Sequence, residues 1–166
     1  MLSLLWPASW IAFIPIVIIE TWIAKQLLNL MWKPLIIRVG IANAFSTLVG
    51  IPLTWGVLAA TEILLTHGGR AYGLDTIPKK LIAVVIQAPW LIPYEADLGW
   101  MIPSAAVVLL IPFFFVSVFS ERWIFNRKKQ FDNALVKTWS WKANLVTYGI
   151  IEILLAIILV YNILNT

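Results

Sequence analysis

The sequence predicts an all-α integral membrane protein with four transmembrane helices. Of its 166 residues, 61% are hydrophobic and 12% are charged, and the mean hydropathy is +0.91. Soluble domains are about half apolar and about a quarter charged. The apolar residues form blocks of about 20, which is the length a helix needs to cross about 30 Å of hydrocarbon. We therefore expect residues 1–166 to form a single transmembrane domain.

The first two predicted spans cover about residues 4–24 and 39–65. The first carries Glu20 near its end and lacks the basic start of a signal peptide, so we interpret it as a retained span. The second contains Gly50 and Pro52, which membrane helices tolerate because neighbouring helices and local adjustment satisfy the freed backbone groups. Together these two spans form one predicted helical hairpin.

The third predicted span covers about residues 100–120, and Pro103 and Pro112 bend it or delay its start. The fourth covers about residues 143–164. Between spans two and three, residues 81–94 are apolar but contain two prolines and are short for a crossing. We interpret that segment as re-entrant or interfacial. The alternative is a fifth span, which would place the two chain ends on opposite sides of the membrane.

Basic residues predict the orientation of the chain. Nine of the twelve lysines and arginines lie in the connections after spans one and three. They are Lys25, Lys33, Arg38, Arg122, Arg127, Lys128, Lys129, Lys137 and Lys142. By the positive-inside rule these two connections face the cytoplasm, and both termini lie outside it. This asymmetry explains the net charge of +4, so we expect no nucleic-acid partner.

A weak internal repeat relates the two halves of the chain. Glu20 precedes Asn43 by 23 residues, and Glu121 precedes Asn144 by the same spacing. The repeat, if it is not coincidence, predicts two tandem hairpins of the same orientation. Glutamate and asparagine would then hydrogen-bond across each hairpin, because an unpaired polar group at that depth is costly. For Glu20 we favour this contact, whereas for Glu121, next to Arg122, we favour a solvated position in the headgroup region.

A row of small residues in the second span indicates a contact between helices. Small residues recur every four positions along the second span, at Ala42, Ser46, Gly50 and Thr54. That spacing lets another helix approach closely, although small residues are also common by chance in membrane helices.

Glu152 lies within the apolar fourth span, where a charge costs roughly 2.5–3.5 kcal/mol. It either packs against another helix or partner, for instance through Tyr148 or Asn144, or it carries protons or a cation.

The sequence indicates no enzyme, cofactor or metal site. It contains no cysteine and one histidine, His67, which excludes thiolate chemistry and makes a histidine-rich metal site unexpected. None of the common catalytic or nucleotide-binding motifs is present. The cytoplasmic run Arg127, Lys128 and Lys129 predicts contact with anionic lipid headgroups, and its plainer role is to fix the topology.

One family resemblance covers about the first 65 residues. The order of Glu20, Asn43-x-x-Ser46-x-x-x-Gly50 and Glu62 over two spans and a short basic loop resembles small filament-integrity membrane proteins of the FraC type. It also resembles a wider set of small bacterial membrane proteins. The resemblance implies a bacterial cytoplasmic or internal membrane, and a role in a multi-protein junction at the septum between adjoining cells.

We expect a non-enzymatic membrane subunit that packs against other membrane proteins, because the loops are too short to form a site. A septal junction component and an accessory subunit of an energy-converting complex both belong to this class. The alternative is a small transporter or an ion or proton conduit that uses Glu152.

Overall fold

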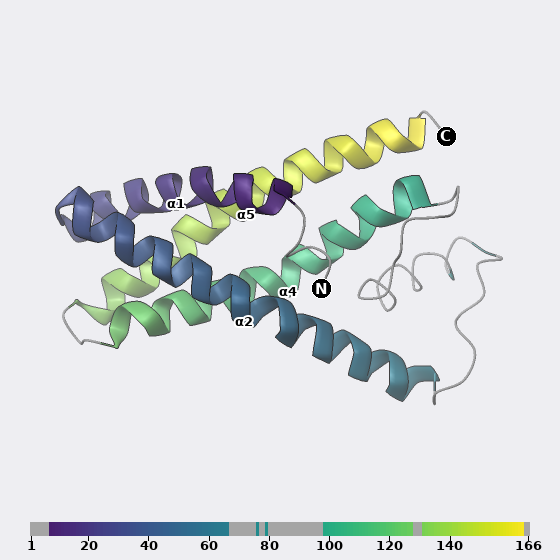
Figure 1. The fold of residues 1–166 in the computed structure, drawn as a ribbon, viewed down its shortest axis with the longest axis horizontal. Coiled ribbons are helices and arrows are strands. Elements are labelled where there is room, and N and C mark those ends of the chain that lie inside the picture. Colours follow the sequence, from purple (N-terminus) through teal and green to yellow (C-terminus); the bar gives the residue numbers. More distant parts are fainter. Residues whose placement is uncertain (1–6, 67–75, 77–78, 80–97, 128–130, 165–166) are drawn as a thin grey trace. The chain divides into compact units, whose positions relative to one another are not determined.

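The computed structural model describes residues 7–66, 76, 79, 98–127 and 131–164. Four helices account for nearly all of these residues: α1 (Pro7–Leu28), α2 (Trp32–Thr66), α4 (Leu98–Asn126) and α5 (Asn133–Leu164) (Figure 1). Each is long and apolar enough to cross a membrane. The predicted all-α fold with four helices of spanning length is therefore confirmed. The segment 81–94, predicted to be re-entrant or interfacial, lies outside the described residues.

The helices extend beyond the apolar blocks that predict them. Helix α4 ends at Asn126 instead of about Ser120, and α5 begins at Asn133 instead of about Ala143. Long basic side chains allow this, because their apolar stems can lie along a helix while the charge reaches water. Helix α4 also continues through Pro103 and Pro112, so neither proline delays its start.

Local hydrogen bonds define two helix ends at the short connections. After α1, Asn29 has a φ of 50°, and its backbone N–H donates to the Lys25 carbonyl at 3.1 Å. Asparagine is one of the few residues that adopts this left-handed conformation readily, which makes it a suitable helix end. Before α5, the Asp132 carboxylate accepts a hydrogen bond from the Ala134 N–H at 2.9 Å and caps the new helix.

The chain divides into two compact units. Unit 1 comprises Met1–Ile51 and Phe113–Ile150, and unit 2 comprises Pro52–Pro112 and Ile151–Thr166. Helix α1 lies in unit 1, whereas α2, α4 and α5 each continue from one unit into the other. In the described part of unit 2, the buried side chains include Thr54, Ala59 and Ala105. Among the described residues, most of the buried side chains belong to unit 1.

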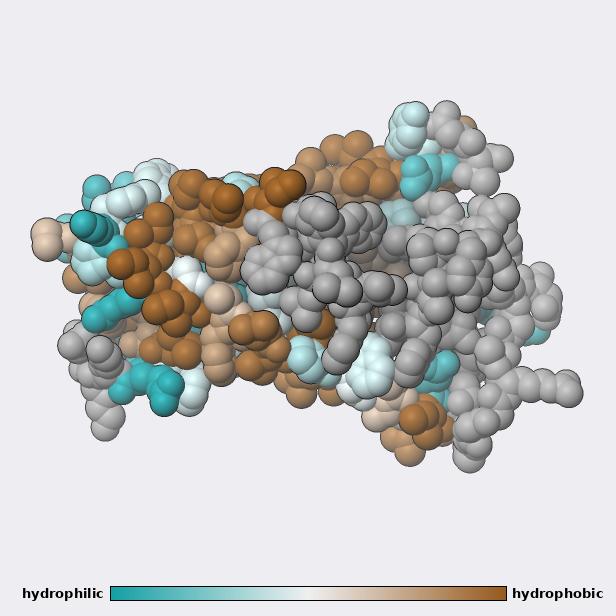
Figure 2. All heavy atoms as spheres, viewed as in Figure 1, coloured by the Kyte–Doolittle hydropathy of each residue, from teal (hydrophilic) through white to brown (hydrophobic). Residues whose placement is uncertain are grey.

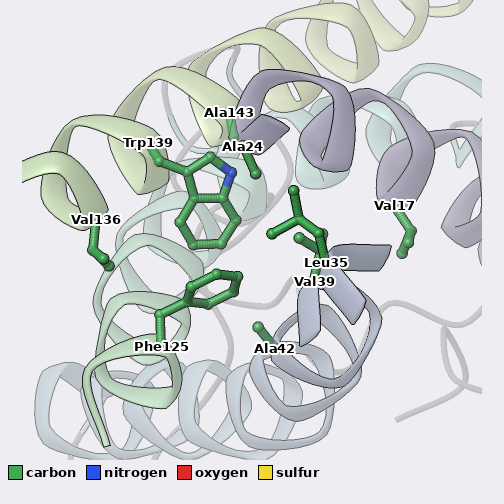
Figure 3. Packing of buried hydrophobic residues seen from close by; sticks show 9 residues of the cluster. All are labelled: Val17, Ala24, Leu35, Val39, Ala42, Phe125, Val136, Trp139 and Ala143. Atoms are coloured by element: carbon green, nitrogen blue, oxygen red, sulfur yellow. The ribbon is translucent and has the colours of Figure 1, made fainter. Parts of the chain in front are cut away.

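The core of unit 1 combines apolar packing with one buried tryptophan. Its buried residues are Val17, Ala24, Leu35, Val39, Ala42, Phe125, Val136, Trp139 and Ala143 (Figure 3). The Trp139 ring lies 4.2 Å from the Phe125 ring, centroid to centroid, and its indole N–H donates to the Glu20 carbonyl at 3.1 Å. A buried tryptophan needs such a partner for its N–H. The core thus joins helices from both hairpins.

The outside of the helices is apolar. Large hydrophobic side chains are exposed along all four helices, and Figure 2 shows hydrophobic residues over much of the coloured part of the visible face. Hydrophilic side chains gather at the left end of this view, where the α1–α2 and α4–α5 connections lie in Figure 1. Both basic connections therefore lie at the same end of unit 1.

Candidate functional site

The first hairpin contains the hydrogen bond predicted from its sequence. Asn43 of α2 donates from its Nδ2 to Glu20 Oε2 of α1 at 2.6 Å. The same amide also donates to the Val39 carbonyl, one turn earlier in α2, at 3.2 Å. Both Asn43 and Glu20 are buried. The Asn43 amide therefore uses both of its N–H groups, one on its own helix and one across the hairpin.

The second hairpin repeats this arrangement. Asn144 of α5 donates from its Nδ2 to Glu121 Oε2 of α4 at 2.7 Å, and to the Ser140 carbonyl at 3.0 Å. The expectation that Glu121 is solvated beside the basic loop is wrong, because its side chain is 0% exposed. Helix α4 continues past Ser120, so Glu121 lies inside the bundle, while Arg122 binds Asn133 Oδ1 at 3.1 Å.

Hydroxyl groups then connect the two hairpins reciprocally. Thr147 of the second hairpin donates to Glu20 Oε1 at 3.0 Å, and Ser46 of the first lies 3.4 Å from Glu121 Oε1. Each hydroxyl lies three residues after the asparagine of its own hairpin. Each carboxyl group thus contacts an amide from its own hairpin and a hydroxyl from the other. We call these six side chains the crossed network: Glu20, Asn43, Ser46, Glu121, Asn144 and Thr147.

The equivalence of the two hairpins extends to burial. Several pairs of residues 101 positions apart share the same environment: Leu35 and Val136 are both fully buried, and so are Ala42 and Ala143. On the outside, Trp22 is 56% exposed and Trp123 is 53% exposed. The weak repeat in the sequence therefore corresponds to an equivalent set of contacts and exposed positions in the structure.

The electrostatics of the crossed network are unusual for a protein interior. All four carboxyl oxygens of Glu20 and Glu121 accept from neutral groups, and neither side chain forms an ion pair within the described residues. The Asn144 Oδ1 atom is buried without a hydrogen-bond partner in that part of the chain. Buried charge without a counter-charge is costly. Neutral amide and hydroxyl donors therefore take the place of a counter-charge at both carboxyl groups.

Sequence reasoning missed several neighbours of the crossed network. Ser140 donates to the Val118 carbonyl at 2.6 Å, and the Ser117 and Tyr148 hydroxyls lie 2.7 Å apart. The Phe114 ring meets the Tyr148 ring edge-on at 5.7 Å. One signal could have found Ser140, because it lies one turn before Asn144 and so on the same helix face.

The small-residue face of α2 packs inside the chain. Ala42, Ser46, Gly50 and Thr54 are all buried. A Cβ atom at Gly50 would lie 3.3 Å from the Phe113 ring and 3.4 Å from Val116, both on α4. Helix α4 is therefore the neighbour at Gly50, and at Ser46 through Glu121. A partner protein would have to use other residues.

The remaining predicted site residues lie away from the crossed network. Glu152 is half-buried in unit 2 and makes no hydrogen bond to another described residue. Arg127 is exposed, and its guanidinium lies 4.7 Å from the centre of the Trp123 ring. Lys128 and Lys129 lie outside the described residues. The described residues contain no group of three acidic or histidine side chains that could hold a metal ion.

Comparisons with protein-family models, curated proteins and solved structures give no match for this chain.

Proposed function

We propose that the chain is an integral protein of a bacterial cytoplasmic or internal membrane, with both termini outside the cytoplasm. Helix length and hydropathy support this location. So do exposed tryptophans near the two basic connections, because tryptophan favours the boundary between hydrocarbon and headgroups. They are Trp22, Trp32, Trp123 and Trp141. Lys25 and Arg127 lie over two of these rings, which brings positive charge to the same depth.

Within that membrane, we propose that the chain is a non-enzymatic subunit that packs against other membrane proteins. The observation that carries this proposal is that the acidic side chains of the crossed network are buried in unit 1, whereas its exposed faces are apolar. Glu20 and Glu121 are both 0% exposed and bonded to one another's hairpins, so they are not available to act on a substrate. The outer faces offer hydrophobic contact instead.

Two equivalent outer stripes are the candidate partner surfaces. On α1 the exposed residues include Ile14, Ile18 and Trp22, and on α4 they include Phe115, Phe119 and Trp123. The two stripes correspond residue by residue at the repeat spacing of 101. Aromatic side chains are enriched in protein interfaces, so the α4 stripe is the stronger candidate.

The kind of assembly follows from the resemblance of the first 65 residues to FraC-type proteins, which points to a junction between cells at the septum. An accessory subunit of an energy-converting complex is the other member of the same class. Purification from native membranes in a mild detergent tests the proposal. A stable complex with a different membrane protein is expected, and a clean homo-oligomer would contradict it.

The second candidate function is a small transporter or an ion or proton conduit that uses Glu152. One observation favours it: Glu152 is an ionisable side chain in an apolar helix, and no described residue gives it a hydrogen bond. Ionisable groups at such positions are often part of an ion or proton path.

A further inference from the structure

Two arginines from different hairpins line one pocket at the basic end of unit 1. The pocket has a volume of about 440 Å³, and its lining includes Arg38 of α2 and Arg127 from the end of α4. Ile41, Ile124 and Phe125 form apolar parts of the same wall. The pocket thus combines two positive charges with hydrocarbon, which is the combination that an amphipathic anion needs.

Both guanidinium groups pack on aromatic rings. Arg38 lies 5.0 Å from the centre of the Phe131 ring, and Arg127 lies 4.7 Å from that of Trp123. Such packing limits the positions that a long side chain can take, so less entropy is lost when it binds a ligand. Two arginines held in this way can present several N–H donors to the same phosphate group.

The internal repeat provides a second argument for a ligand at this place. The residue equivalent to Arg38 in the second hairpin is Trp139, which is fully buried in the core. The residue equivalent to Arg127 is Gln26. One hairpin therefore fills this position with an apolar ring, whereas the other has a charged side chain beside an open pocket. At this position, therefore, the first hairpin brings a positive charge to the pocket.

The apolar wall identifies the class of anion. Ile41 is 55% exposed and extends the pocket onto the apolar outer face of α2. A free phosphate would contact the arginines but not this hydrocarbon, whereas a phospholipid would place its phosphate at the arginines and its acyl chains along the helix. Basic pockets between transmembrane helices on the cytoplasmic side are known sites for anionic headgroups.

We propose that this pocket binds one anionic phospholipid, whose phosphate is held by Arg38 and Arg127 and whose acyl chains lie along Ile41 and Ile124. The lipid would join α2 of the first hairpin to α4 of the second. The proposal rests on the membrane location proposed above, but it needs no protein partner.

Lipid titration of the full-length protein in detergent, followed by native mass spectrometry, tests this site. The probes are phosphatidylglycerol, phosphatidylcholine and inorganic phosphate. The informative variants are Arg38→Lys and Arg127→Lys, because lysine keeps the charge but loses the two-pronged hydrogen bonding of arginine. Lys33→Arg is the matched control, since Lys33 is exposed on α2 and does not line the pocket.

We expect wild type to prefer phosphatidylglycerol over phosphatidylcholine, and the double lysine variant to lose roughly tenfold in phosphatidylglycerol affinity. Lys33→Arg should not change it. Unchanged affinity in the double variant would show that only general positive charge acts, and would overturn the proposal. Competition by inorganic phosphate at similar concentration would also overturn it, in favour of a phosphate site. A thermal melt of each variant in detergent confirms that the bundle is intact, and Arg127→Lys alone serves if the double variant unfolds.

Discussion

The Thr147 hydroxyl donates a hydrogen bond to Glu20 Oε1 at 3.0 Å, although 127 positions separate the two residues in the sequence. The equivalent contact in the other direction joins Ser46 to Glu121. Each hairpin therefore supplies the carboxyl group for one crossed contact and the hydroxyl group for the other. Together with the apolar core, this reciprocal pair of contacts joins the two hairpins within unit 1.

Thr147→Val should weaken the bundle, because valine keeps the shape of threonine but leaves the Glu20 carboxyl group without its donor from the second hairpin. We expect a loss of about 1 kcal/mol in the free energy of unfolding. Thr138→Val is the matched control: Thr138 is exposed on the same helix, and within the described part of the chain it makes only the intrahelical bond to the Ala134 carbonyl. Thermal or denaturant unfolding in detergent measures both. Equal effects of the two substitutions would show that the crossed bond adds no stability.

Gly50→Leu should separate α2 from α4. The new side chain would begin 3.3 Å from the Phe113 ring and would then have to enter the packed interface. Overpacking of this kind costs roughly 1–3 kcal/mol. Gly56→Leu provides the control in the same helix, since no atom of the described chain lies within 4 Å of the position of its Cβ. If Gly50→Leu melts like Gly56→Leu, this helix face does not pack tightly.

The basic connections should face the cytoplasm and both termini should lie outside it. The chain contains no cysteine, so single cysteines introduced at Ser3, Asn133 and Thr166 can each be labelled without background. An impermeant thiol reagent applied to intact spheroplasts should label positions 3 and 166 but not 133. Labelling of position 133 would show that the α4–α5 connection faces outward, which would contradict the predicted orientation. Opposite results for positions 3 and 166 would instead indicate five spans.

Much of the fold was predictable, because blocks of about 20 apolar residues leave few alternatives to transmembrane helices. The helix ends were not predictable from hydropathy. Hydropathy falls at the first charged residue, whereas the backbone continues to form helical hydrogen bonds beyond it. The position of Glu121 next to Arg122 predicts the headgroup region for the same reason, although Glu121 lies about one turn inside a helix that ends at Asn126.

The candidate site was predictable in part. The bond between Glu20 and Asn43 follows from their equal depth on adjacent helices. The crossed contacts depend on how two hairpins dock, and no local pattern contains that information. Trp139 shows the same limit: tryptophan in a membrane protein usually lies at the interface, but this one is fully buried and bonded to the Glu20 carbonyl.

Glu152 distinguishes the two candidate functions. Glu152→Gln keeps the size and the hydrogen-bonding groups but removes the titrating proton, whereas Glu152→Leu removes both. If Glu152 contacts a partner helix, Gln should be tolerated and Leu should weaken assembly. If it carries protons or a cation, Gln should already abolish transport while the complex stays intact. Native mass spectrometry and a flux assay in vesicles measure the two outcomes. If both variants assemble and transport like wild type, Glu152 has neither role.

The proposal that this chain packs against other membrane proteins is tested most directly by photocrosslinking in intact cells. A photoreactive amino acid is placed at Phe119 on the exposed α4 stripe, and in a control at the adjacent buried residue Val118. The account predicts that position 119 captures a discrete, different membrane protein, and that position 118 gives only links within the chain. Capture of lipid alone, or of a second copy of this chain, from position 119 and from the equivalent Ile18 on α1 would contradict it.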